Sequence, residues 1–363
     1  MQSYNKSFLW MVLLMILTGL FILLSASMGL LIREEGSFSR TFFNQLAFGV
    51  GGGFILFLIT SKINYKNWKK YSAPFFILSF ILTALVFIKP FGFEHGGAIR
   101  WIELGLISFQ PSEILKLAFV VYLSSWLASR KSEIQSFKFG LLPFLVMVGF
   151  VGIILIKQPD VGTLGVLVIT SLFLFFLGGG KYSQIFSLII LGFLIFATLI
   201  AFEPYRMDRF KIFMDPSADP QGTGYQLKQS LIAIGSGGIF GRGFGMSVQK
   251  FNYLPEPIGD SIFSVFGEEF GFIGCVLLLA LFLFFLYLGF RISIRAPDDF
   301  SRLLGAGIVI LVITGVFVNI ASMIGIVPLT GVPLIFISKG GSALAVSLAE
   351  MGILLNISKY NKK

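Results

Sequence analysis

The sequence predicts an all-α polytopic membrane protein with about ten transmembrane helices and one large extracytoplasmic loop before the eighth. Hydrophobic residues make up 56% of the 363 residues and charged residues only 13%, whereas an average soluble domain has about 25% charged residues. The mean hydropathy is +0.89. The apolar residues also gather into runs that match a hydrocarbon core about 30 Å thick, which a helix of about 20 residues crosses.

Ten candidate spans follow one another along the chain, at residues 8–32, 43–60, 73–88, 114–128, 140–156, 162–177, 183–201, 261–290, 303–326 and 343–357. The first is interpreted as a retained helix, because a second span follows it and it lacks a small-residue cleavage site. From residue 203 to residue 260 no apolar run is long enough to cross a bilayer, which predicts a long, folded polar loop. Residues 1–363 are therefore expected to form a single integral membrane domain.

The basic residues predict the orientation, because positive charge concentrates in short cytoplasmic loops. With the amino terminus inside, the inner segments carry most of the lysines and arginines, including Lys62, Lys66, Lys69 and Lys70. Both termini are thus predicted to be cytoplasmic, and the loop at 203–260 is predicted to face outward from the cytoplasmic (inner) membrane. The net charge of +10 fits this topology and attraction to anionic lipids, and it gives no reason to expect a nucleic-acid partner.

The scarcity of cysteine and histidine narrows the chemistry. Cys275 and His95 are the only residues of their types, which excludes a Cys/His metal site, a disulfide and a thiol–histidine dyad. Any catalysis must use carboxylates, lysines, arginines or an oxygen-bound metal. The glycine-rich stretch at 235–245 only superficially resembles a nucleotide loop, because no strand precedes it and it is predicted to lie outside the cytoplasm. No organic cofactor is expected.

Charged residues near membrane helices are costly unless they are paired or hydrated, so each marks a candidate site. Glu113 and Lys116 share one helical face, either as a structural ion pair or as a cavity wall whose lysine meets a phosphate. Asp160 precedes the sixth span and is read as a helix N-cap or as a site residue. The adjacent Glu268 and Glu269 point about 100° apart, so we expect at most one of them to face a cavity.

Asp260 lies at the predicted outer mouth of the eighth span, four residues after Glu256 and just behind two prolines. Taken alone, it reads as an ordinary N-cap, a role that contributes about 1 kcal/mol. A carboxylate at a partly apolar helix mouth is also suited to work as a general base. The residues by themselves leave both interpretations open.

Eight short motifs follow in order from about residue 95 to the carboxyl end. They read GGAIRW at 96–101, FQPSE at 109–113, KQPDVGT at 157–163, GYQ at 224–226 leading into AIGSGG at 233–238, YLPE at 253–256, GEEFG at 267–271, PLTGVP at 328–333 and ISKGGS at 337–342. In this order they resemble the SEDS family (shape, elongation, division and sporulation), typified by FtsW, RodA and SpoVE. The carboxyl-terminal residues 352–358 are more similar to the FtsW branch.

The resemblance implies a peptidoglycan glycosyltransferase that polymerises lipid II, an undecaprenyl-pyrophosphate-linked disaccharide peptide, during cell division or elongation. By that match Asp260 holds the position of the family's essential aspartate and becomes the expected catalytic base. Positive charge, or a divalent cation such as Mg²⁺ or Mn²⁺, would stabilise the departing pyrophosphate. The expected substrate-binding residues are Arg100, Trp101, Glu113, Lys116, Asp160, Arg242, Lys250, Glu256, Lys339 and Ser342.

This chain departs from the family pattern at three motifs, one of which is the basic doublet before Trp101, replaced here by Ile99-Arg100. The usual His-Thr-Asp-Phe is replaced by residues 258–261, of which only Asp260 is retained, and Lys339 stands where the family has a tyrosine. Lys339 either faces a phosphate or extends outward past the interface. Two other functions stay open: a lipid II flippase or transporter, and a non-catalytic scaffold that activates a partner.

The resemblance further implies a class B penicillin-binding protein transpeptidase as partner in a cell-wall synthesis complex. We expect its membrane helix to pack on the eighth and ninth spans, where pairs of glycines, at 271 and 274 or at 305 and 307, permit close approach. The substrate should enter sideways from the outer leaflet near Trp101, an interfacial anchor, along an apolar loop at 91–111 that lies flat on the membrane. Cysteines placed at Trp101 and Leu254 should then be accessible from outside.

Overall fold

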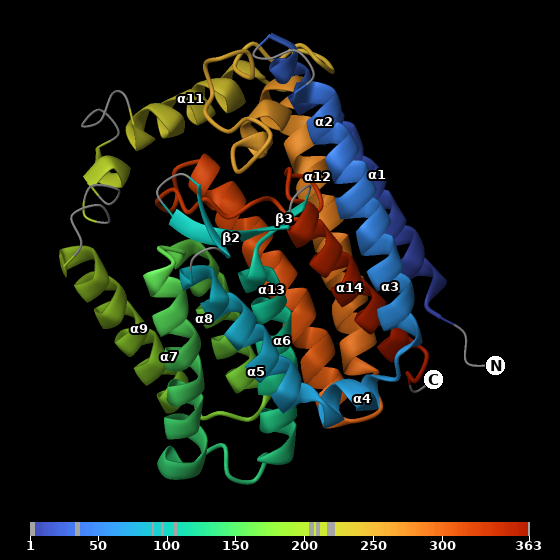
Figure 1. The fold of residues 1–363 in the computed structure, drawn as a ribbon, viewed down its shortest axis with the longest axis vertical. Coiled ribbons are helices and arrows are strands. Elements are labelled where there is room, and N and C mark those ends of the chain that lie inside the picture. Colours follow the sequence, from blue (N-terminus) through green and yellow to red (C-terminus); the bar gives the residue numbers. More distant parts are fainter. Residues whose placement is uncertain are drawn as a thin grey trace.

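The chain forms a bundle of apolar helices with a small sheet and a folded loop at one end (Figure 1). The structure is a computed structural model that describes residues 4–32, 37–88, 91–95, 98–104, 107–202, 207, 211–215 and 222–361. The main helices are α1 (Lys6–Ser27), α2 (Ser37–Asn44), α3 (Gly53–Lys62), α4 (Tyr65–Lys70), α5 (Ser72–Ala84), α6 (Pro111–Ser129), α7 (Leu142–Lys157), α8 (Val161–Leu177), α9 (Tyr182–Phe202), α11 (Thr223–Ser236), α12 (Ile262–Ile294), α13 (Asp299–Met323) and α14 (Gly341–Ser358). Shorter elements are the 3-10 turns η1 (Met28–Ile32) and η3 (Leu85–Phe87), the π-helical turns η2 (Gln45–Gly52) and η4 (Phe137–Leu141), and the strands β1 (Gly92–His95), β2 (Ala98–Leu104) and β3 (Ile107–Phe109).

Seven helical segments of the described residues are long and apolar enough to cross a membrane. They are Lys6–Leu30, Thr41–Lys62, Pro111–Ser129, Phe137–Lys157, Ile262–Ile294, Asp299–Met323 and Gly341–Ser358. Three shorter apolar helices cover Ser72–Phe87, Val161–Leu177 and Tyr182–Thr198. In order and position these segments match the predicted spans, which confirms the polytopic all-α class. Ten crossings remain a prediction, because three of the segments are short.

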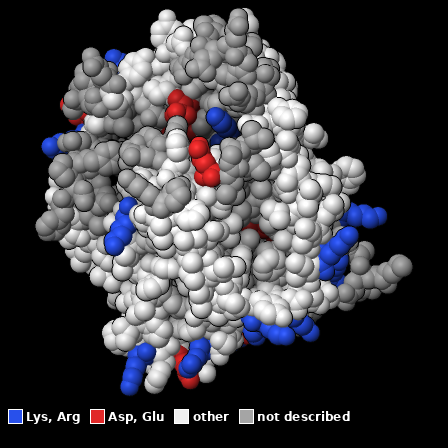
Figure 2. Space-filling view, in the orientation of Figure 1, with Lys and Arg blue, Asp and Glu red and all other residues white. Residues whose placement is uncertain are grey.

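The charged side chains border an uncharged band on the face shown in Figure 2. Lys and Arg gather mainly toward the lower end, where α4 and the turn between α6 and α7 lie in Figure 1, and a smaller mixed group of acidic and basic side chains lies near the upper end. The surface between them is mostly uncharged. This distribution is that of a protein whose middle faces lipid and whose ends face water.

The two carboxyl-terminal helices form the centre of the bundle. In both α13 and α14, 83% of the most apolar window is buried inside the protein, compared with 22% for the segment Thr41–Lys62. Gly352 permits the close contact of α14 with α3, since a Cβ there would lie 2.0 Å from Thr60 Oγ1. Thr60 Oγ1 also donates to the carbonyl of Ala349 at 2.9 Å. Helix α14 is therefore fixed in the core, and this fixes the position of its first turn.

A three-stranded antiparallel sheet lies at the upper end of the bundle in Figure 1. Its strands pair in the order β1-β2-β3, with Phe93 opposite Trp101 and Ile102 opposite Phe109. This sheet corrects the expectation of a loop without strands at 91–111, whereas the position of the segment flat on the membrane stays a prediction. The only polar residues at 98–104 are Arg100 and Glu103, three positions apart, so this segment lacks the two-residue alternation that usually identifies a strand.

Helix α12 is broken near its first third, at Gly271, where φ is 62° and ψ is −163°. The break frees backbone groups on both sides, and the glycine-rich loop after α11 pairs with them. Arg242 N donates to the carbonyl of Glu268 and Gly243 N to that of Glu269, while Phe272 N and Ile273 N donate to the carbonyls of Gly238 and Ile239. Inside a membrane such a break persists only where protein satisfies the backbone. The glycine-rich stretch at 235–245 thus packs over the break in α12 and pairs with its free backbone groups.

Candidate active site

Asp260 lies in the turn that leads into the first part of α12, and it is half-buried. The N-cap residue of α12 is Ser261, whose side chain makes no capping hydrogen bond, so the interpretation of Asp260 as an ordinary N-cap is wrong. Gln226 Nε2, from α11, lies 3.3 Å from Asp260 Oδ1 and 3.4 Å from Oδ2, and it also donates to Ser261 Oγ at 3.0 Å. Helix α11 therefore orients the carboxylate. The candidate list from the sequence omitted Gln226, although it stands in the GYQ motif.

The backbone of the Asp260 turn is held from two other elements. Asn319, from α13, donates through Nδ2 to the carbonyl of Asp260 at 2.8 Å. Ser338 Oγ donates to the carbonyl of Gly259 at 2.6 Å, and Lys339 N donates to that of Ile258 at 2.8 Å. Three consecutive carbonyls are thus fixed by the core helix and by the segment before α14. Such support keeps a reactive side chain in one position.

Glu256 shapes this turn from its other end. Its backbone has a φ of 46°, and its carbonyl accepts hydrogen bonds from Gly259 N at 3.0 Å and Ser261 N at 3.3 Å. The side chain is exposed, which leaves a substrate contact as a prediction. Leu254 is fully buried, so the expectation that a cysteine placed there would be accessible from outside is wrong.

Glu268 binds the loop that covers the broken helix. Its carboxylate accepts hydrogen bonds from Ser247 Oγ at 2.6 Å and from Val248 N and Gln249 N at 3.1 Å each. Arg242 Nη1 lies 3.3 Å from Glu268 Oε1, with about two fifths of the arginine side chain exposed. Arg242 thus pairs with a structural carboxylate, and a contact of its exposed part with the substrate stays a prediction.

Glu269 and Lys250 form a second buried pair, and both side chains are almost completely enclosed. Lys250 Nζ lies 2.7 Å from Glu269 Oε1 and donates to the carbonyl of Ser25 at 3.0 Å. Ser25 Oγ donates to Glu269 Oε2 at 2.5 Å. The expectation that Lys250 contacts the substrate is wrong in this structure, because its charge is neutralised in the core. Both glutamates therefore have packing roles, Glu268 toward the covering loop and Glu269 toward Lys250 and Ser25.

Arg100 and Asp160 meet at the junction of β2 and α8. Arg100 Nη1 lies 3.8 Å from Asp160 Oδ1, and Arg100 Nε donates to the carbonyl of Gln158 at 2.9 Å. Asp160 caps α8 by accepting from Thr163 N at 3.2 Å, so its predicted N-cap role is confirmed. Gln110 Nε2 donates to Asp160 Oδ2 at 3.1 Å. These contacts anchor the sheet, with its half-buried Trp101, onto the helices.

Glu113 and Lys116 form a buried ion pair at 2.9 Å in the first two turns of α6. Lys116 also interacts electrostatically with Glu350, a buried residue of α14. The geometry supports the structural interpretation of the pair. Glu350 could not be identified as a site residue from the sequence, because a lone glutamate inside an apolar span has no local signal that identifies its partner.

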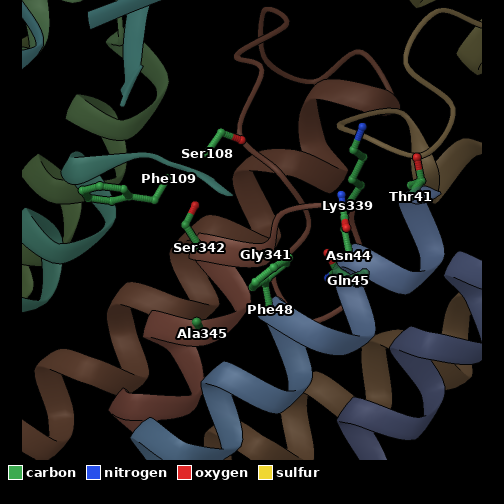
Figure 3. Close-up of a pocket in the computed structure, with 10 residues that line it drawn as sticks. All are labelled: Thr41, Asn44, Gln45, Phe48, Ser108, Phe109, Lys339, Gly341, Ser342 and Ala345. Carbon is green, nitrogen blue, oxygen red and sulfur yellow. The ribbon is translucent and has the colours of Figure 1, made fainter. Parts of the chain in front are cut away.

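A cavity of about 280 Å³ opens between the start of Thr41–Lys62, strand β3 and the start of α14 (Figure 3). Its polar lining includes Thr41, Asn44, Ser108, Lys339 and Ser342. Ser342 Oγ also lies 3.4 Å from Gln110 N, which links the cavity to the Arg100 and Asp160 cluster. The backbone bond from Lys339 to Ile258 links it to the Asp260 turn. Asp260, Lys339, Ser342, Asp160 and Arg100 thus belong to one connected end of the bundle.

The described residues contain no group of three or more Asp, Glu, His or Cys side chains that could hold a metal ion. Beside the Asp260 carboxylate, the hydroxyl of Ser261 supplies a further oxygen, and Gln226 Nε2 donates to both groups. This donor set by itself does not make a closed metal site. The expected Mg²⁺ or Mn²⁺ therefore stays a prediction, and no step of the mechanism depends on it.

These features define a class of protein: a polytopic membrane protein with a carboxylate at the mouth of a broken helix. The chain belongs to the family of cell cycle proteins that comprises FtsW, RodA and SpoVE, which it matches over residues 5–363. It is 38% identical over 353 residues to stage V sporulation protein E of Bacillus subtilis, covering 96% of this chain and 95% of that protein. It is 38% identical over 306 residues to the probable peptidoglycan glycosyltransferase FtsW of Geobacter sp. M18, covering 84% and 83%.

The fold is also that of a solved chain from a peptidoglycan synthase complex described as coordinating polymerization and crosslinking. The TM-score is 0.80 at 25% identity, and the superposition covers 99% of each chain. Family and fold together confirm the SEDS resemblance and a multi-pass membrane protein.

Proposed function

We propose that this protein is a peptidoglycan glycosyltransferase that polymerises lipid II at the outer face of the cytoplasmic membrane, with Asp260 as its catalytic base. Family membership and the names of the relatives support the reaction class. The assignment of the base to Asp260 rests on the geometry of its carboxylate. Gln226 orients this carboxylate, and Asn319 and Ser338 hold the turn that carries it.

The proposed reaction uses the Asp260 carboxylate that this turn presents. The 4-hydroxyl of an acceptor sugar loses its proton to Asp260 as its oxygen attacks the anomeric carbon of the growing strand. The bond from that carbon to the pyrophosphate oxygen breaks, and undecaprenyl pyrophosphate leaves. A fixed carboxylate within reach of the hydroxyl contributes both general-base catalysis and orientation.

The orientation of the chain supports the same proposal. With both termini cytoplasmic, the even-numbered spans run inward, so the starts of α12 and α14 face outside. The Asp260 turn and the cavity beside Lys339 then lie at the outer interface, where a lipid-linked sugar presents its pyrophosphate. Cysteine labelling from either side of the membrane at Tyr253, which is exposed, would test this topology.

A class B penicillin-binding protein is the partner that this function requires, because the polymer must be crosslinked by a second enzyme. The glycines of α13 cannot receive it: a Cβ at Gly305 would meet Ser293, and one at Gly307 would meet Val120, so intramolecular packing occupies both. Helix α12 instead exposes large apolar side chains, among them Phe272, Leu277 and Phe284. We therefore assign the partner's membrane helix to the exposed face of α12.

The direct test is polymerisation of labelled lipid II by the purified protein, alone and with the partner transpeptidase. Production of glycan strands supports the proposal. A flippase would instead move lipid II across a vesicle bilayer without forming strands, and a scaffold would do neither while still binding the partner.

A further inference from the structure

The cavity beside Lys339 has the chemistry of an anion site rather than of a gap between helices. Lys339 is exposed and is the single charged residue among the residues that line the cavity. No described carboxylate forms an ion pair with it. Figure 3 shows its ammonium group at the upper side of the cavity, toward Thr41, with the hydroxyls of Ser108 and Ser342 on the opposite side. A cation and several hydroxyl donors thus surround one space.

The start of α14 adds to this positive field. Its N-cap, Gly340, provides no side-chain capping bond, and Gly341 and Ser342 line the cavity. The N–H of Gly340 donates to Gln45 Oε1 at 3.1 Å, whereas no described side chain accepts from the N–H groups of the next three residues of this 18-residue helix. Helix N-termini with such groups attract phosphate, and a neighbouring lysine strengthens the attraction.

Part of the cavity lining is apolar: Phe48 and Ala345 lie in its lower part in Figure 3, and Phe109 lies at its left side. A fully hydrated ion gains little from such a surface, whereas a ligand with a charged head and a hydrocarbon chain satisfies both parts. The cavity also lies next to the Asp260 turn, through the hydrogen bond from Lys339 N to the carbonyl of Ile258.

We propose that this cavity is a diphosphate subsite, in which Lys339 and the start of α14 bind the pyrophosphate of an isoprenoid-linked substrate. This inference rests on the proposed function and identifies which part of that substrate the cavity takes. Lys339 supplies the positive charge at this cavity. Its contribution would come as a charge-assisted hydrogen bond, which is about twice as strong as a neutral one.

The test measures binding without catalysis, in the full-length protein reconstituted in phosphatidylcholine nanodiscs. The probe is farnesyl pyrophosphate, with farnesol and inorganic pyrophosphate as competitors that carry only one half of the ligand chemistry. We expect Lys339→Met and Lys339→Gln to weaken binding about 10-fold, and Lys339→Arg to stay within about 3-fold of the parent protein. The matched control is Lys66→Met, an exposed lysine on α4, which should leave binding unchanged.

Equal affinity of the parent protein and both neutral Lys339 variants would overturn the inference. Competition by phosphatidylglycerol as strong as that by farnesyl pyrophosphate would overturn it too, because the cavity would then take an ordinary lipid headgroup. Lipid II polymerisation measured in parallel separates the two proposals. A protein that binds the probe through Lys339 but makes no strands contradicts the proposed function alone, and strand synthesis with Lys339-independent binding contradicts the diphosphate subsite alone.

Discussion

Asn319 donates one amide group to two backbone carbonyls at the active site, that of Asp260 and that of Val332, each at 2.8 Å. Asn319 is fully buried in α13, the helix at the centre of the bundle. The amide therefore joins the turn that carries Asp260 to the loop that precedes α14. Asn319 thus fixes the backbone of the candidate base to the core helix α13.

Replacing Asn319 with alanine should reduce activity, because the turn that carries Asp260 would lose a hydrogen bond that holds it in position. The two carbonyls would each lose a buried donor, which costs about 1–3 kcal/mol, and a small displacement of a reactive group lowers rates by about 10- to 100-fold. We expect kcat for strand synthesis to fall by that range with KM nearly unchanged. The control is Ser322→Ala, one turn further along α13, whose hydroxyl bonds only to the carbonyl of Asn319. Equal activity of Asn319→Ala and Ser322→Ala would show that the clamp has no catalytic importance.

Gly271→Ala should destabilise the protein strongly. The backbone at Gly271 has φ 62° and ψ −163°, a region open essentially to glycine alone, and an added Cβ would lie 2.3 Å from Gly241 N. The strain costs about 1–3 kcal/mol, and displacement of the covering loop would add to it. Thermal melting in detergent measures the effect. Gly192→Ala in α9, where a Cβ meets no atom within 4 Å, is the control and should melt at or above the parent temperature.

Lys250→Met tests whether Lys250 supports the structure. It leaves Glu269 buried without its counter-ion, a change that costs about 3–5 kcal/mol. We expect a large fall in melting temperature and partial recovery in the double variant Lys250→Met, Glu269→Gln, because both charges are then removed. If Lys250→Met instead lowered substrate affinity at an unchanged melting temperature, Lys250 would have a role in substrate binding and no structural role.

The stability of the protein depends on pH through Asp298, which lies at the start of α13 and outside the predicted spans. Partial burial opposes its ionisation, but hydrogen bonds from the Ser301 backbone N–H and from the hydroxyls of Tyr65 and Ser301, with Lys69 nearby, lower the pKa of Asp298 below its usual value. The ionised group therefore stabilises the fold at neutral pH, and this contribution is lost as the pH falls through the lowered pKa.

The matched variant for this prediction is Asp298→Asn, which keeps a capping side chain but carries no charge. Because Asp298 is only partly buried and largely exposed, we expect the Asp298→Asn variant to melt only slightly below the parent protein at pH 7, by an amount equivalent to under about 1 kcal/mol. The two melting curves should converge as the pH is lowered toward 3. A difference that stays constant across that range would contradict the assigned pKa shift.

The helices could be predicted from the sequence because membrane burial leaves a local signal. Each apolar run predicts a membrane span, and Asp160 before Val161 predicts a helix N-cap. The sheet at Gly92–Phe109 was missed, since its strands are three to seven residues long and only their mutual pairing makes them stable.

The site was harder to predict, because the partner of a charged residue is set by tertiary packing. Lys250 meets Glu269 and Ser25, which is 225 residues away along the chain, so no spacing rule links them. Gln226 and Asn319 reach Asp260 from two other helices. Only the motif order of the family pointed to Asp260 itself, whereas the residues that orient it required the fold.

The most direct test of the account is strand synthesis by Asp260→Asn, measured with purified protein and labelled lipid II beside its melting temperature. Asparagine keeps the shape of the side chain and can still contact Gln226 and Ser261, but it cannot accept the proton of the attacking hydroxyl. The account predicts a protein that melts within a few degrees of the parent, binds lipid II and its partner, and forms no detectable glycan strands. A well-folded Asp260→Asn variant that polymerises lipid II at the parent rate would contradict the assignment of Asp260 as the base.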